Sequence, residues 1–301
     1  MKDVYFKVLD DGFIALKDYM GTDLDIEQAA RVSYGKGTRK TSDTRNLLRY
    51  LMRHRHTTPF EMCELKFHIR APIYVFRQWH RHRTWSYNEY SGRYSEMIDS
   101  LEKTSPDKWR TQSADNKQGS GGYLPVKTTE QGDYNGDELS ANESWFHNIA
   151  TEIYKTRLRR GVAKEQARKD LPVSNYTEMY GKTDLKNLLH FMSLRSDGHA
   201  QLEIRQYADI ISSMVKELFP ITFEAWYDYV FAANNWTRLD QQLMQTVLNN
   251  AASLNDNDAM NKMAESIGMS KREISEFYEK LNNAKNKDFT LDYNNLYNTS
   301  I

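Results

Sequence analysis

The feature that most constrains the fold is a strict alternation of side chains between positions 63 and 70. The odd positions carry Cys63, Leu65, Phe67 and Ile69, and the even positions carry Glu64, Lys66, His68 and Arg70. Successive side chains of a β-strand point to opposite faces, so this pattern predicts a strand with one buried and one solvent-facing side. The fold therefore has to include a half-buried sheet.

Other patterns predict the elements around this strand. Alternation predicts further strands at 4–8 and 13–16, joined by a turn at Asp10–Gly12. Apolar residues recur at helical spacing within 26–32, 43–55, 72–81, 145–158, 185–192 and 204–218, the last ended by Pro220. A shorter helix is expected to end at Arg168. We predict an α/β (α+β) fold in which an antiparallel or mixed sheet is flanked by helices.

Two polar segments divide the chain. Residues 96–140 hold five of the 14 glycines and many Ser, Thr, Asp and Asn residues, which predicts an inserted loop. Beyond about residue 234 the chain is rich in Asn but keeps a helical pattern at 274–281. We expect a catalytic domain over 1–233, with the insertion at 96–140, and a helical C-terminal extension over 234–301.

The balance of charge and the cysteine content exclude several classes of protein. Lys+Arg and Asp+Glu are equal at 41 each, so binding to nucleic acid or membranes through bulk charge is disfavoured. The single cysteine excludes a disulfide framework. No apolar stretch is long enough for a membrane span, and the N-terminus lacks the apolar core of a signal peptide. We expect a cytoplasmic location.

The densest concentration of functional side chains runs from Arg77 to Tyr94, RQWHRHRTWSYNEYSGRY. Arginine forks bind phosphate in bidentate geometry, and Asn and Glu can pair with the edges of a base. A run of charge is usually only a solvated face, but the density here favours a site for an anionic ligand of nucleotide size. No Gly-x-Gly-x-x-Gly or Walker loop occurs, so a dinucleotide would not be held as in a Rossmann fold.

Two other chemistries are disfavoured. The pairs His54/His56 and His80/His82, with Glu61, have a spacing that can ligate metal, but arginines between them would repel a cation, so we predict no metal site. Cys63 shares a strand face with apolar residues, which favours a buried and inert thiol over a nucleophile.

Three motifs together resemble one enzyme family. They are His56-Thr57-Thr58-Pro59-Phe60-Glu61, then Arg81-His82-Arg83 followed after seven residues by Ser91, and Leu194-Arg195-Ser196-Asp197-Gly198-His199-Ala200-Gln201. In this order and spacing they closely resemble the flavin-dependent thymidylate synthases, whose signature is Arg-His-Arg-x7-Ser. The resemblance covers roughly residues 1–230 without the insertion. Alone, the third motif would equally suit an Arg195–Asp197 pair and a capping His199.

The resemblance implies an α/β homotetramer with active sites at the subunit interfaces. FAD would bind there, and dUMP would be methylated to dTMP with carbon from 5,10-methylenetetrahydrofolate. Reduced flavin would supply the hydride, and NADPH would reduce the flavin. Because the only cysteine is expected to be buried, C5 of uracil would be activated electrostatically, and the resemblance assigns that role to Arg195.

The resemblance also implies binding residues. Those for dUMP are Gln78, Trp79, His80, Arg81, Glu89, Tyr90, Ser91, Gly92, Arg93, Arg168 and Arg195, with Arg93 and Arg168 suited to the phosphate. Those for FAD are Ser33, Thr58, Arg81, His82, Arg83, Glu89, Asp184, Leu185, Lys186, His190 and His199. His56 and Tyr94 would lie near the flavin ring and the folate. Asp184, Lys186 and His190 depart from residues found in some members.

Two rival functions stay open. Ala264, Gly268 and Ile274 have the spacing of a helix-turn-helix, with Lys271 and Arg272 at the start of its second helix, which would suit a nucleic-acid-binding module. The tail has no basic excess, so packing on a neighbouring subunit is the favoured role and nucleic-acid binding is not expected. A flavoprotein that binds nucleotide without methylating it is the second rival.

Overall fold

The computed structural model describes residues 1–32, 43–114, 117–127, 135–249, 257–269 and 271–286. Two compact units make up the chain, one over Met1–Trp226 and one that begins at Tyr227. Across the described residues, no helix combines the length and the apolar character that crossing a membrane would need.

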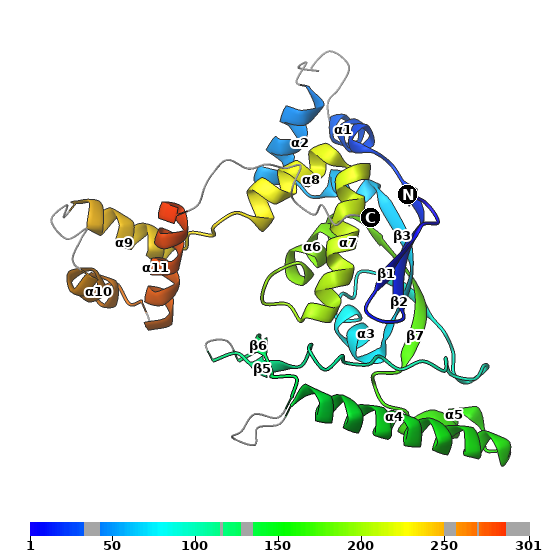
Figure 1. Cartoon of the computed structure of the whole chain (residues 1–301). Coiled ribbons are helices and arrows are strands. Elements are labelled where there is room, and N and C mark those ends of the chain that lie inside the picture. The colour runs from blue at the N-terminus through cyan, green and yellow to red at the C-terminus, as the bar shows by residue number, and fades with distance from the viewer. Residues whose placement is uncertain (33–42, 115–116, 128–134, 250–256, 270, 287–301) are drawn as a thin grey trace. The chain divides into compact units, whose positions relative to one another are not determined.

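The first unit is built on a five-stranded sheet (Figure 1). Its strands are β1 (Tyr5–Val8), β2 (Gly12–Met20), β3 (Glu64–Pro72), β7 (Tyr176–Asp184) and β4 (Ser86–Glu89), in the spatial order β1-β2-β3-β7-β4. All neighbours pair antiparallel, so of the two arrangements expected, the antiparallel one is present. The alternation in β3 is confirmed, since Leu65, Phe67 and Ile69 are fully buried.

Helices pack on this sheet and on one another. They are α1 (Asp23–Arg31), α2 (Thr44–Arg53), the 3-10 turn η1 (Thr58–Met62), α3 (Ile73–Trp79), α6 (Leu185–Arg195), α7 (Leu202–Leu218) and α8 (Pro220–Trp226). Helix α3 packs on both β3 and α7, and α7 packs on α6 (Figure 1). As predicted, α7 ends before Pro220, but that proline then opens α8, because its fixed φ suits a first helical turn.

The inserted segment has more structure than a loop. It contains a hairpin of β5 (Arg110–Gln112) and β6 (Ser120–Tyr123). It is also shorter than predicted, since α4 (Gly136–Arg159) begins before residue 140, with the Asn135 side chain accepting the backbone N–H of Glu138 at 2.7 Å. Gly161 (φ +76°) follows α4 as predicted, before α5 (Lys164–Ala167) and the 3-10 turn η2 (Arg168–Asp170).

The second unit is a small helical bundle. After the short π-helix η3 (Tyr227–Phe231) come α9 (Arg238–Asn249), α10 (Asn257–Ser266) and α11 (Lys271–Asn286). Its core includes Ala264 and Phe277, both fully buried, and Gly268 takes a φ of +87° between α10 and α11. The predicted helix at 274–281 is confirmed by α11, whose exposed side carries Glu273, Glu276 and Glu279.

Candidate active site

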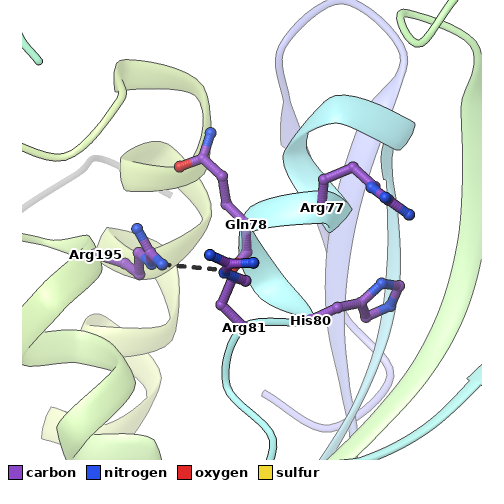
Figure 2. Close-up of a pocket in the computed structure, with 5 residues that line it drawn as sticks. All are labelled: Arg77, Gln78, His80, Arg81 and Arg195. Carbon is purple, nitrogen blue, oxygen red and sulfur yellow. Dashed lines mark hydrogen bonds between the residues drawn. The ribbon is translucent and has the colours of Figure 1, made fainter.

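A pocket of about 600 Å³ lies where the end of α3 meets the end of α6 (Figure 2). Its lining residues are Arg77, Gln78, His80, Arg81 and Arg195. The volume lies within the range of small-molecule sites, and three of the five residues carry a guanidinium group. The arrangement therefore suits an anionic ligand of nucleotide size.

Trp79 fixes this end of α3. Its indole is fully buried and stacks on Phe191 of α6 at 4.8 Å, so the neighbours Gln78 and His80 are left to line the pocket. Of the residues expected to contact dUMP, Trp79 thus has its ring in the core, and only its backbone could reach a ligand. Arg77, which the sequence reasoning did not select as a site residue, lines the pocket one position before Gln78.

Arg195 is drawn into the pocket by two hydrogen bonds. Its Nη2 donates to the backbone carbonyl of Gln78 at 3.4 Å (Figure 2). Its Nε–H donates to Nε2 of His82 at 3.0 Å. Burial lowers the pKa of Arg195, although an arginine keeps its charge at neutral pH. The site thus contains a half-buried, partly desolvated cation held by neutral groups.

A second cluster gathers Ser91, Gly92 and Arg168. Gly92 is buried against Arg168, and a Cβ at Gly92 would lie 2.2 Å from the Met97 Sδ atom and 3.0 Å from the Arg168 Nη1 atom, so a side chain here would displace both neighbours. Arg93 is exposed and pairs with Glu165 at 3.2 Å. Tyr90 lies beside them, and its hydroxyl donates to the backbone carbonyl of Glu96. This cluster contains the residues expected at the phosphate.

Glu89 of β4 lies between the second cluster and the pocket. Its Oε1 accepts the Thr177 hydroxyl at 3.3 Å, and its Oε2 lies 3.9 Å from Nε2 of His80. The carboxylate therefore lies beside His80 of the pocket, and in the sequence it directly precedes Tyr90 of the second cluster.

Most residues expected at FAD lie outside the pocket lining. Thr58, Arg83, His190 and His199 are exposed, and Nδ1 of His199 lies 2.8 Å from Oδ1 of Asp197, which accepts its hydrogen bond. Asp184 caps α6 by accepting the backbone N–H of Asn187, and Leu185 is buried. Lys186 lies 4.0 Å from Glu61, and Ser33 falls outside the described residues.

The two residues expected near the flavin ring and folate are also on the surface. The imidazole of His56 stacks on Tyr50, with ring centroids 5.9 Å apart, and Tyr94 is 80% exposed. Neither lines the pocket, so a site that used them would have to extend beyond the five lining residues.

Cys63 is buried as expected. Its thiol is fully covered, and burial, followed by the charges of Asp25 and Asp23, raises its pKa to about 12. The thiolate, which is the reactive form, is therefore scarce at neutral pH. Within the described ranges, no set of three or more His, Cys, Asp or Glu side chains is arranged to hold a metal ion.

The chain is similar to proteins of one family. Residues 15–221 match the family model described as "Thymidylate synthase complementing protein". A "Flavin-dependent thymidylate synthase" from Wolbachia pipientis wMel is 45% identical over 242 residues, covering 80% of this chain and 83% of that protein. The protein of the same description from Dictyostelium discoideum is 41% identical over 283 residues, 91% and 85% of the two chains.

A solved structure has a similar fold. It is the crystal structure of "a UMP/dUMP methylase PolB from Streptomyces cacaoi bound with 5-Br dUMP", with a TM-score of 0.64 and 32% identity. The alignment covers 74% of this chain and 98% of that chain.

Proposed function

The chain belongs to the flavin-dependent thymidylate synthase family, and we propose that its cationic pocket holds the uracil ring of dUMP while the ring is methylated to dTMP. The observation that carries this proposal is Arg195, a half-buried guanidinium at the pocket wall whose partners are an imidazole and a carbonyl. A cation in a water-poor site stabilises a negative charge that develops on a ligand.

Arg195 would favour the anionic form of the pyrimidine that has lost its N3 proton. Charge on the ring raises electron density at C5, the carbon that takes the methylene group. Cys63 is buried, and its high pKa disfavours the covalent addition of a thiolate at C6. Electrostatic activation is therefore the route that suits this site.

The carbon and the electrons would come from co-substrates. We infer that 5,10-methylenetetrahydrofolate supplies a methylene group, which becomes a methyl group by gaining a hydride. NADPH would be the ultimate source of that hydride, giving dTMP, tetrahydrofolate and NADP⁺. When bound, FAD would supply the hydride carrier between NADPH and the pyrimidine.

The phosphate of dUMP would lie at the second cluster. Arg168 packs against Gly92 without a carboxylate partner among the described residues, so its guanidinium can take a phosphate in bidentate fashion. Arg93 would exchange its exposed pairing with Glu165 for the ligand, at little cost because such pairs are weak. The pyrimidine would then extend past Glu89 toward Arg195.

The residues present also suit FAD. Its diphosphate needs cationic donors, and Arg81 at the pocket and the exposed Arg83 offer guanidinium groups, while the exposed His199 offers an imidazole. Asp184, Leu185 and Lys186 open helix α6. The N–H groups of Leu185 and Asn187 already have partners there, so the ammonium of Lys186 is the group that could pair with a phosphate. His56 and Tyr94 would border the flavin ring and folate from surface positions.

We propose a homotetramer with sites completed between subunits. The support is a stripe of exposed apolar side chains on α4, namely Trp145, Phe146, Ile149 and Ile153, which are 40–65% exposed. Several residues expected at the cofactor are surface residues outside the pocket, as a shared site would require. The extension after residue 233 would pack on a neighbouring subunit, and its three exposed glutamates on α11 disfavour phosphate backbones.

The test is formation of dTMP from dUMP, 5,10-methylenetetrahydrofolate and NADPH, with and without FAD, and with UMP as an alternative substrate. The purified protein should be yellow, and Arg195→Ala should lower kcat by at least about 100-fold. Cys63→Ala should leave turnover largely intact. A colourless protein that FAD cannot reconstitute, or a folded cysteine variant without activity, would contradict the proposal.

A further inference from the structure

The hydrogen bonds that hold Arg195 leave its positive charge available to a ligand. A guanidinium has five N–H donors, and the bonds to His82 and to the Gln78 carbonyl use two of them. Three donors remain for a ligand. Among the described residues Arg195 forms no ion pair, so no carboxylate cancels the positive charge.

His82 can act as the acceptor because it is neutral. The ring is 7% exposed and contacts Phe191 edge-on at 4.8 Å. Burial, followed by the charge of Arg195 and that of His190, lowers the pKa of His82 to about 4. Both of these neighbours come from α6, and the centroids of the His82 and His190 rings lie 6.1 Å apart. With Nε2 accepting, the ring proton lies on Nδ1.

Local structure also holds the His82 backbone in place. Its N–H donates to the carbonyl of Trp79 at 2.9 Å, and its own carbonyl accepts the Tyr87 hydroxyl at 2.9 Å. Since Trp79 is part of the core, the imidazole is connected to the rigid body of the molecule. The acceptor is therefore placed before any ligand arrives.

We propose that His82 is a positioning residue, which fixes the guanidinium plane of Arg195 by accepting its Nε–H and, being neutral, leaves the charge of Arg195 to the pyrimidine. This role rests on the proposed function and differs from the flavin contact that the resemblance implies for His82. A carboxylate at the same place would hold the arginine equally well but would cancel its charge.

Three variants at His82 separate two effects, the placement of the Arg195 guanidinium and the cancellation of its charge. His82→Gln keeps a neutral acceptor, and His82→Ala removes the acceptor. In His82→Glu the new side chain has nearly the shape of glutamine but carries a negative charge. His147→Gln is the matched control, because His147 is also a buried histidine whose pKa burial lowers, and it bonds Ser174 at 2.9 Å away from the pocket.

With FAD and dUMP saturating, we expect His82→Gln to retain kcat within about 10-fold of wild type, and His82→Glu to lose at least about 100-fold. His82→Ala should also lose at least about 10-fold in kcat. FAD affinity, measured by flavin fluorescence titration, should change less than about 3-fold in all three. The control should match the wild type.

A spectroscopic measurement tests the contact without turnover. In protein labelled with ¹⁵N-arginine, the Nε–H signal of Arg195, assigned by its loss in Arg195→Lys, should exchange slowly with water in wild type, His82→Gln and His82→Glu. It should exchange rapidly in His82→Ala. Equal exchange in wild type and His82→Ala would overturn the contact.

The outcomes distinguish this proposal from the proposed function. If wild type makes dTMP but the His82→Gln and His82→Glu variants have equal kcat, the claim that residue 82 must be neutral is wrong. If the variants change only FAD affinity, His82 is a cofactor contact and the positioning role is wrong. If wild type makes no dTMP, the proposed function fails, and slow exchange at Arg195 would still support the contact.

Discussion

At the scale of residues, burial decides the chemistry of the site. The same desolvation keeps His82 neutral, lowers the pKa of Arg195 and raises that of Cys63 to about 12. Burial keeps the Cys63 thiol protonated and therefore unreactive. At Arg195, burial lowers the local dielectric, which strengthens the attraction between the guanidinium and an anion. The division of roles follows from which of them borders the pocket.

The lowered pKa of His82 predicts how stability changes with pH. In the unfolded chain this imidazole binds a proton near pH 6.5, but in the folded protein only near pH 4. As the pH falls below 6.5 the unfolded state therefore binds more protons, and stability is lost. From pH 7 to pH 5 the wild type should lose about 2 kcal/mol more unfolding free energy than His82→Gln. Urea unfolding of both proteins at each pH measures this, and equal losses would contradict it.

At the scale of elements, the insertion is tied to the helix that borders the site. Arg110 of β5 pairs with Glu203 at 2.5 Å, and both side chains are mostly buried. Glu203 lies in the first turn of α7, two residues after Gln201. The Gln201 side chain accepts a hydrogen bond from Gln78 in the pocket wall. The hairpin is thus connected, through the start of α7, to the pocket-lining side chain of Gln78.

Arg110→Ala tests this connection. The variant leaves Glu203 buried without its cation, which should cost about 2 kcal/mol of unfolding free energy. The KM for dUMP should rise about 5-fold, because Gln78 and Gln201 lose a fixed anchor. The double variant with Glu203→Ala also removes the carboxylate that lost its partner and should recover part of the stability in urea unfolding. A double variant as unstable as the sum of the two single ones would contradict the coupling.

The sequence predicts elements with strong apolar periodicity and misses the others. The pattern at 63–70 gives β3, whereas β7 goes unnoticed because Thr177, Gly181 and Thr183 stand where apolar residues would mark a buried strand. The hairpin β5–β6 is missed because all its residues except Arg110 are exposed, and because β6 includes two glycines. In the site, the motifs identify Arg195, but the partnership with His82 joins residues 113 positions apart, which no local pattern reveals.

At the scale of the whole molecule, helix α4 carries an exposed apolar surface that a partner protein could cover. Its stripe of Trp145, Phe146, Ile149 and Ile153 is apolar and exposed, while Tyr154 and Ala150 on another side of the helix are buried. Contiguous apolar surface of this kind marks interaction sites. A second copy of the chain is the partner that the proposed tetramer provides.

Ile149→Asp should therefore weaken assembly. Light scattering on a sizing column should give four times 35.4 kDa for wild type and a smaller mass for the variant, because a charge would be buried in the interface. Bound flavin should fall together with the mass if sites are shared. Asn148→Asp places the same charge about 100° around the helix and serves as the control. A wild-type monomer that binds FAD fully would contradict the shared site.

The covered thiol of Cys63 also bears on how the protein responds to oxidants. It is the only cysteine, so no internal disulfide can form, and its lack of thiolate slows conversion to sulfenic acid or a mixed disulfide with glutathione. A thymidylate synthase that depends on a reactive cysteine is open to both reactions. The one thiol of this chain should therefore react slowly with peroxide or with oxidised glutathione.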